Sequence, residues 1–243
     1  MKPRPLCRLI LGAALLTAAA GSYADDFSQA RTKINSIKPN IPYNTFCAST
    51  PSGEDKMACQ IKSIPTVGLL VCKQDDYDGK SCDSLIKEET DNLKATQRAG
   101  LTTVTFKPEI LKPLKCADSA STECGGYLTS WVSQGNFVNI DDTIHDGHVV
   151  ELANSIQRYS TSPAALAKTR ADLKKIADFM TASGGKYSRV CDLQGFYLRS
   201  GGFLINDVPA LKLNEKTAPN CWDGMPTWQQ AHDGLEQLIR LLK

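Results

Sequence analysis

The segment SPAALAKTRADLKKIADFMTASGG, residues 162–185, carries the most complete helix pattern in the chain. The Ser162 side chain can accept a hydrogen bond from the exposed amides of a first turn, and Pro163 fits that turn because it has no amide hydrogen. Gly184 and Gly185 mark its end. Apolar residues recur at helical spacing, and charged residues fill the opposite side. The predicted buried stripe is Leu166, Leu173, Ile176 and Met180, and the predicted solvent face is Lys168, Asp172, Lys174, Lys175 and Asp178.

Further regular elements flank this helix on both sides. Apolar residues repeat at spacings of three and four over 149–159, which predicts a second amphipathic helix. The stretch 193–206 holds two strand-like runs around a glycine pair, the composition of a tight hairpin. Thr227 and Gln230 form the pattern of a capping box before a last amphipathic helix. The C-terminal half is therefore predicted to be helix-rich, with a β-hairpin near 193–206.

The N-terminal half has fewer regular patterns and more cysteines. Helical spacing predicts a short helix over 26–38 and a longer one over 81–98. Runs rich in Val, Leu and Thr predict strands at 66–72 and 101–106. Since no repeat, low-complexity linker or charge run divides residues 25–243, we predict a single disulfide-stapled α+β domain over that range.

Residues 1–24 have the three-part pattern of an export signal. A basic start precedes an apolar run from Leu9 to Gly21, and Ser22-Tyr23-Ala24 is a small-x-small cleavage site. The apolar run has 13 residues, whereas a membrane-spanning helix needs about 20. We therefore expect a cleaved signal peptide that ends at Ala24, a periplasmic or secreted mature protein, and no membrane anchor after cleavage.

Removal of this signal changes the charge of the chain. The full sequence has 28 Lys and Arg against 26 Asp and Glu, and residues 1–24 hold three of the basic side chains and none of the acidic ones. The formal charge therefore falls from +2 to −1. Because so balanced a chain exerts no bulk attraction on polyanions, we expect no nucleic-acid partner.

The cysteines give a second sign of export. Cys7 lies in the signal, and an even number remains: Cys47, Cys59, Cys72, Cys82, Cys116, Cys124, Cys191 and Cys221. An even count in an exported chain is typical of a disulfide framework. The spacings suggest that each cysteine pairs with its neighbour in the order just given. No Cys-x-x-Cys occurs in the chain, so a structural zinc site is not expected.

One segment groups candidate catalytic or metal-binding side chains, namely Asp141, His145, His148 and Glu151. A zinc hydrolase motif needs two histidines four residues apart with a glutamate beside the first, and here the histidines are three apart. The simpler interpretation is a first helical turn in which acids are favourable next to the helix dipole. We therefore expect no metal and no cofactor. A secreted hydrolase, possibly metal-dependent and built on these four residues, is the alternative function.

Asp75, Asp76 and Asp78 form an acidic cluster in a loop between two cysteines. If Gly79 is aligned with the glycine of an EF-hand loop, a glutamine and a leucine fall at the first and last ligand positions, where carboxylates belong. A calcium loop is therefore not predicted. The cluster is a candidate surface for a protein partner, against the simpler interpretation of a solvated turn.

No pattern in the sequence predicts a catalytic nucleophile or a phosphate-binding loop. The chain has no Gly-x-Ser-x-Gly elbow, its glycine pairs are isolated, and disulfides would occupy every mature cysteine. A rigid exported domain suits binding, because a preorganised surface loses little entropy on association. We therefore expect a periplasmic protein that binds another protein, such as an inhibitor or a toxin-immunity protein, without catalysis of its own.

Overall fold

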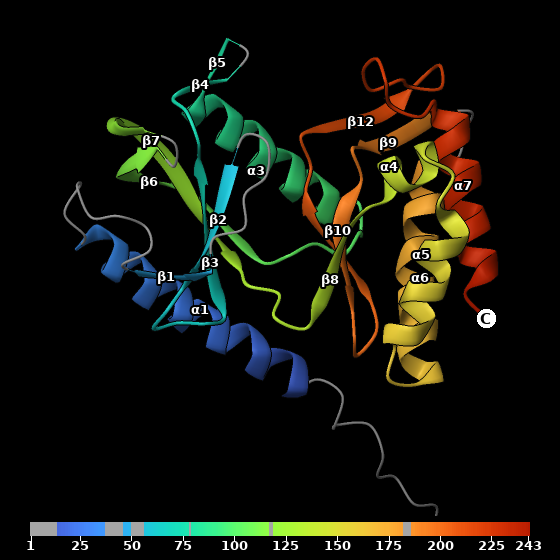
Figure 1. Ribbon diagram of the computed structural model, residues 1–243, viewed down its shortest axis with the longest axis horizontal. Coiled ribbons are helices and arrows are strands. Elements are labelled where there is room, and N and C mark those ends of the chain that lie inside the picture. Colours follow the sequence, from blue (N-terminus) through green and yellow to red (C-terminus); the bar gives the residue numbers. More distant parts are fainter. Residues whose placement is uncertain (1–13, 37–45, 50–55, 78, 117–118, 182–185) are drawn as a thin grey trace, which may run out of the picture. The chain divides into compact units, whose positions relative to one another are not determined.

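The structure of the protein is a computed structural model that describes residues 14–36, 46–49, 56–77, 79–116, 119–181 and 186–243. The chain folds into two compact units (Figure 1). Unit 1 comprises Met1–Cys82 and Glu109–Trp131, and unit 2 comprises Asp83–Pro108 and Val132–Lys243. The single domain over 25–243 stays a prediction.

Unit 1 is built on a five-stranded sheet with the order β1-β2-β3-β7-β6. The central strand β3 pairs antiparallel with both β2 and β7. Val67, Leu69 and Val71 on one face are completely buried, and Cys72 on the other face is 1% exposed, so the near-continuous apolar sequence of β3 reflects packing on both sides. The strands are β1 Cys47–Ser49, β2 Lys56–Ile61, β3 Val67–Cys72, β6 Phe106–Cys116 and β7 Ser119–Ser130.

Unit 1 also contains a helix and a small hairpin. Helix α1, Ala14–Asn35, packs on β3 and β7 and buries Phe27, Ala30 and Ile34, three residues at helical spacing. Strands β4, Asp76–Tyr77, and β5, Lys80–Ser81, pair antiparallel and form the hairpin.

Unit 2 combines a three-stranded sheet, a two-stranded ribbon and a group of helices (Figure 1). The sheet has the order β11-β10-β8, and the ribbon pairs β9 with β12. The strands are β8 Gly135–Asn139, β9 Tyr187–Cys191, β10 Gln194–Leu198, β11 Phe203–Asp207 and β12 Ala210–Glu215. The helices are α3 Cys82–Arg98, α4 Ile140–His145, α5 Val149–Tyr159, α6 Pro163–Met180 and α7 Trp228–Leu241. Helix α7 packs against α4, α5 and α6.

The α+β class and most of the elements with strong local signals are confirmed. The Ser162 hydroxyl accepts a hydrogen bond from the Ala165 amide at 3.1 Å and opens α6 as predicted. Thr227 and Gln230 form both halves of the capping box of α7. Strands β10 and β11 form the predicted hairpin, which makes unit 2 the helix-rich, hairpin-bearing part of the chain.

Three sequence-based predictions are wrong in detail. Asp172 is not on a solvent face: it is 7% exposed, and its carboxylate accepts hydrogen bonds from the Phe203 amide and the Lys175 ammonium. The predicted strand 101–106 is reduced to a bridge at Thr103 and the first residue of β6. The predicted helix 26–38 is the end of the longer helix α1, and residues 37–38 lie outside the described residues.

Four disulfides join the eight cysteines from Cys47 to Cys221 in the neighbour pairs that their spacing predicted. Two pairs staple unit 1 at short range, Cys47 to Cys59 and Cys116 to Cys124. The other two pairs are Cys72 to Cys82, which closes the loop of the β4–β5 hairpin, and Cys191 to Cys221, which spans 30 positions in unit 2. In the part of the chain that the structure describes, no helix is both long and apolar enough to cross a membrane.

Candidate functional site

The structure separates the four side chains of the predicted histidine cluster. Asp141, on α4, is 2% exposed and points into unit 2. His145 lies at the end of α4 and is exposed. His148 and Glu151 flank the start of α5, and their closest ring nitrogen and carboxylate oxygen are 3.9 Å apart, with both side chains largely in solvent. Across the described ranges, no group of three or more His, Cys, Asp or Glu side chains is placed to hold a metal ion.

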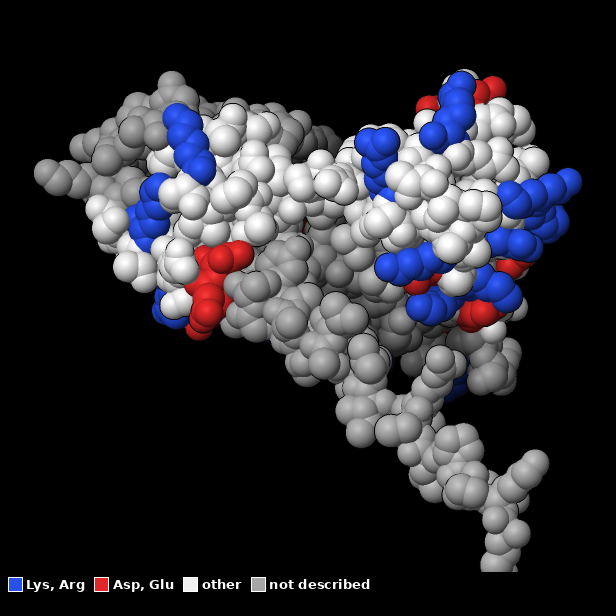
Figure 2. Space-filling model, turned by 90° about the horizontal axis from the view of Figure 1, so that it is seen from below, with Lys and Arg blue, Asp and Glu red and all other residues white. Residues whose placement is uncertain are grey.

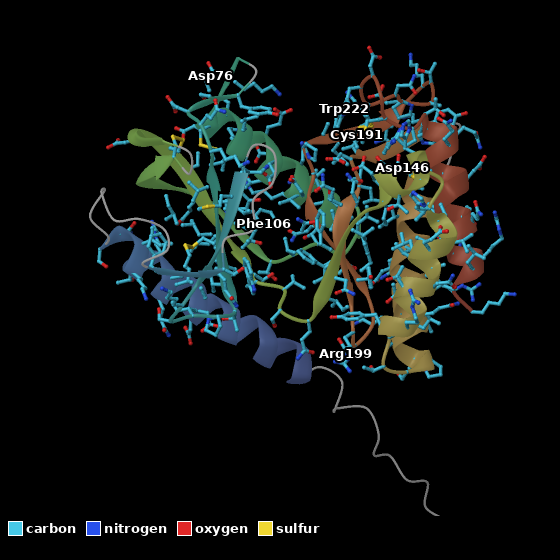
Figure 3. All side chains as sticks on the ribbon, viewed as in Figure 1. Asp76, Phe106, Asp146, Cys191, Arg199 and Trp222 are labelled. Atoms are coloured by element: carbon cyan, nitrogen blue, oxygen red, sulfur yellow. A yellow bond between two sulfur atoms is a disulfide. The ribbon has the colours of Figure 1, made fainter. Side chains whose placement is uncertain are left out.

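The predicted acidic loop is the exposed β4–β5 hairpin, whose Asp76 is labelled in Figure 3. The Asp76 carboxylate accepts a hydrogen bond from the Gly79 amide at 2.9 Å, so it shapes the turn. The Cys82 amide donates to the Asp75 carbonyl at 2.7 Å beside the disulfide. Asp75 is exposed, and Asp78 lies outside the described residues. The hairpin is thus tethered, with at least one of its acids engaged in the turn.

Asp141 instead forms a buried ion pair with Arg189, a residue of β9 that is 1% exposed. The Arg189 Nη2 donates to the Asp141 carboxylate at 3.0 Å, and the Leu193 amide donates to the same oxygen at 3.3 Å. An ion pair this deeply buried stabilises little by itself, because both charges lose their water. Its effect is to fix the position of the guanidinium.

The guanidinium of Arg189 holds a turn that we name the Trp222 turn, residues 221–226. The Arg189 Nη1 donates to the Pro226 carbonyl at 2.7 Å, which anchors the end of the turn. The Cys191–Cys221 disulfide anchors its beginning. Arg189 and Cys191 are two residues apart on β9, so both ends of the turn are attached to one strand. A loop held this way has few other conformations available.

The helix that follows continues this attachment. The Trp228 indole nitrogen donates to the Ser188 carbonyl of β9 at 3.2 Å, and its ring meets Tyr187 edge to face at 5.0 Å. The ring of His232 stacks on Trp228, also at 5.0 Å. The first turn of α7 is therefore fixed to β9 directly after the Trp222 turn.

The Trp222 turn presents a large aromatic side chain to solvent. Trp222 is 45% exposed, and its carbonyl accepts a hydrogen bond from the Met225 amide, which closes the turn. Gly224 has φ +86°, a conformation that side chains disfavour. Figure 3 shows Trp222 near Cys191, at the end of unit 2 opposite Arg199. A rigidly held, exposed tryptophan is the kind of side chain that dominates binding energy at protein interfaces.

Two acidic groups near β9 and α4 have altered titration. Burial raises the pKa of the Asp192 carboxyl, while hydrogen bonds from Asn139 and Gln194 oppose that change. Burial also raises the pKa of Asp142, and the negative charges of Asp146 and Asp141 raise it further. Asp192 directly follows the disulfide cysteine and has φ 53°, and the hydrogen bonds from Asn139 and Gln194 hold its carboxyl in place.

No local pattern in the sequence marks the Trp222 turn as a site. A tryptophan beside a cysteine and before a glycine was visible, but the anchor comes from Arg189 and Asp141, which are 48 positions apart. No protein family matches this chain, and no curated protein matches it in sequence. Its function is therefore inferred from the geometry of its own residues.

Proposed function

We propose that this protein is exported to the periplasm and there binds another protein, as an inhibitor or a toxin-immunity protein does, without catalysis of its own. The observation that supports this most is the Trp222 turn, an exposed aromatic side chain on a segment tied at both ends to β9. Four disulfides agree with an oxidising compartment, where such bonds persist.

Rigidity is what makes the turn suited to binding. Association costs the conformational freedom of every side chain and loop that becomes ordered. The disulfide and the Arg189–Pro226 hydrogen bond tether both ends of the turn and so restrict the Trp222 backbone. The indole adds a large contact area with only two rotatable bonds. A partner with an apolar pocket would therefore gain most of the contact energy of Trp222.

The test is affinity purification with the mature chain, beginning at Asp25, as bait in periplasmic extract. Trp222→Ala is compared with Phe137→Ala, a matched control because Phe137 is an aromatic side chain that is 55% exposed on β8 of the same unit. We expect one stoichiometric protein with wild type and with the control. With Trp222→Ala, affinity should fall by about thirtyfold or more, the effect of losing a central aromatic residue.

Two results would contradict the proposal. Equal retention of the partner by all three baits would show that Trp222 is not in the interface. Absence of any stoichiometric partner, together with turnover of a substrate that depends on Asp141, His145, His148 or Glu151, would replace the binding function by the hydrolase alternative.

A further inference from the structure

One end of unit 2 gathers exposed basic side chains from four different elements. Arg158 lies in the last turn of α5, Lys168 in the second turn of α6, Arg199 directly after β10, and Arg240 in the last turn of α7. We name these four residues the basic end. Figure 2 shows blue side chains gathered over unit 2, with red ones among them.

Hydrogen bonds bring the four elements together at this end. The amide and the hydroxyl of Thr161, between α5 and α6, both donate to the Arg199 carbonyl, at 3.2 and 3.1 Å. The Gln157 side chain of α5 donates to the Leu241 carbonyl of α7 at 2.8 Å. The Gly202 amide of the β10–β11 turn donates to the Thr169 hydroxyl of α6 at 2.9 Å. The basic end therefore stands on a fixed framework.

Within the residues that the structure describes, the four cations of the basic end form no close ion pairs. Hydrogen bonds, above all from Gln229, lower the pKa of the Asp233 carboxyl, and Arg240 is near enough to lower it further. The two other lysines of α6 behave differently, since Lys174 pairs with Asp178 at 2.8 Å and Lys175 with Asp172 at 3.0 Å. The same helix thus uses part of its positive charge internally and leaves Lys168 to solvent.

Helix dipoles explain only half of this arrangement. Arg158 and Arg240 stabilise the carboxyl ends of α5 and α7, where cations are favourable. Lys168 lies toward the amino end of α6, where a cation gains nothing from the dipole, and Arg199 lies in a hairpin turn. The helix dipole therefore gives no reason for the two residues that complete the cluster.

We propose that the basic end is a docking surface for a protein partner whose contacting surface is acidic. This proposal rests on the proposed binding function and adds the charge of the partner. Three of the four side chains are arginines, whose planar guanidinium groups bind carboxylates with two parallel hydrogen bonds. Because the framework is fixed, the four cations present a set spacing to the carboxylates and speed the first encounter.

An anionic membrane is the less favoured occupant. Surfaces that lie on membranes combine Lys and Arg with exposed Trp, Phe or Leu that enter the lipid. The large apolar side chains exposed in the described residues are Phe137, Val150, Leu213 and Trp222. Val150, Leu213 and Trp222 lie in the first turn of α5, on β12 and in the Trp222 turn. Phe137 lies on β8, which pairs with β10 beside Arg199, and it is a single apolar side chain rather than an apolar face.

The test measures binding of fluorescent poly-L-glutamate to the mature protein, a probe that does not require the natural partner. The variant Arg158→Gln/Lys168→Gln/Arg199→Gln removes three charges of the basic end. Lys186→Gln/Lys212→Gln/Lys216→Gln removes the same charge from β12, from the residue before β9 and from the residue after β12, and is the matched control. We expect the first variant to lose affinity about tenfold or more and to show a shallower salt dependence, with the control changing less than about twofold.

Every other outcome decides against the docking surface. Equal losses in the two triple variants would show a non-specific effect of net charge. Binding of vesicles made from equal parts of phosphatidylglycerol and phosphatidylcholine, lost only in the basic-end variant while poly-L-glutamate binding is unchanged, would assign the surface to membranes. Self-association that this variant abolishes would assign it to a second copy. Trp222→Ala should leave poly-L-glutamate binding intact, so failure of this proposal and failure of the proposed function are distinguishable.

Discussion

Arg189 shows how a single residue can connect the core of unit 2 to its surface. It is almost fully buried, yet two of its nitrogens reach separate segments, Asp141 on α4 and Pro226 in the Trp222 turn. Its third nitrogen, Nε, has no hydrogen-bond partner among the described residues. A buried donor without a partner costs free energy, so this arginine is kept despite an imperfect environment. Holding the turn is the benefit that accounts for it.

Removal of Asp141 should therefore destabilise the protein strongly. Asp141→Ala leaves the Arg189 charge buried without its partner, which costs about 3–5 kcal/mol in free energy of unfolding. The double variant Asp141→Ala/Arg189→Met removes the stranded charge and should recover part of that loss. Urea unfolding gives the free energy of unfolding of the wild type, Asp141→Ala, Arg189→Met and the double variant. If the two single substitutions lower the free energy of unfolding by amounts that simply add up in the double variant, the two side chains are not coupled.

Asp192 gives a pH-dependent test at the same scale. Because burial raises its pKa in the folded state, folded protein binds more protons than unfolded protein at pH values above the ordinary Asp value. The destabilisation by Asp192 is thus absent below the unfolded pKa and grows as pH rises through the raised folded pKa. Asn tolerates the left-handed backbone at this position and carries no charge.

Asp192→Asn should therefore be more stable than wild type at neutral pH and equal to it in acid. Urea midpoints of the two proteins, measured in parallel from acid to neutral pH, isolate the contribution of this group from all other titrations. A stability difference that stays constant with pH, or that is largest in acid, would contradict the assignment.

Among the elements, those governed by local signals were predictable and those governed by distant contacts were not. Helix α6 begins at Pro163 because Ser162 caps it, and α7 begins after a capping box that is visible in four residues. The β9–β12 ribbon escaped prediction, since Lys212 pairs with Arg189 across more than 20 positions. Asp172 was misplaced for a similar reason: the amide that needs its carboxylate belongs to Phe203.

Because α4 packs closely on α7, a substitution that normally stabilises a helix should destabilise this protein. Alanine favours a helix over glycine by about 1 kcal/mol, so Gly234→Ala in α7 would normally stabilise. A methyl group there would lie 2.6 Å from a carbon of the Ile144 side chain of α4, closer than two carbon atoms of different side chains can approach. We expect a loss of about 1–3 kcal/mol, typical of an overpacked core.

The matched background is Ile144→Ala, which removes the atoms that meet the new methyl group. In that background Gly234→Ala should stabilise the protein, by up to the helix preference alone. Thermal unfolding of the wild type, the two single variants and the double variant gives the coupling energy between positions 144 and 234. A destabilisation of equal size in both backgrounds would mean that α4 does not limit the residue at position 234.

At the scale of the whole molecule, the proposed export determines the residue at which the mature protein begins. The buried residues of α1, Phe27, Ala30 and Ile34, all follow the predicted cleavage point after Ala24. Cleavage would also place Asp25 and Asp26 in the first turn of the shortened helix, where acids are favourable. The mature protein should therefore keep the described packing of this helix.

The mass of the exported protein should correspond to a chain that begins at Asp25 with all eight cysteines oxidised. Ala24→Tyr should leave the precursor uncut, because the cleavage site requires a small residue. A thiol reagent should label the mature protein only after reduction. Retention of residues 1–24 in the exported protein, or labelling without reduction, would contradict the export route or the disulfide framework.

The two units, finally, allow the predicted single domain to be tested. Loss of the Cys191–Cys221 disulfide, through Cys191→Ala/Cys221→Ala, frees the longest of the four closed loops and should cost about 3–4 kcal/mol in the chain-entropy account. Hydrogen exchange then reports where that loss is felt. If the chain unfolds as one domain, amides of β3 in unit 1 and of β9 in unit 2 should accelerate by the same factor. Because every residue of the disulfide and of the Trp222 turn lies in unit 2, acceleration confined to β9, β12 and α7 would show two domains that open independently. Cys47→Ala/Cys59→Ala, which removes a disulfide of unit 1, is the reciprocal control and should then accelerate β3 alone.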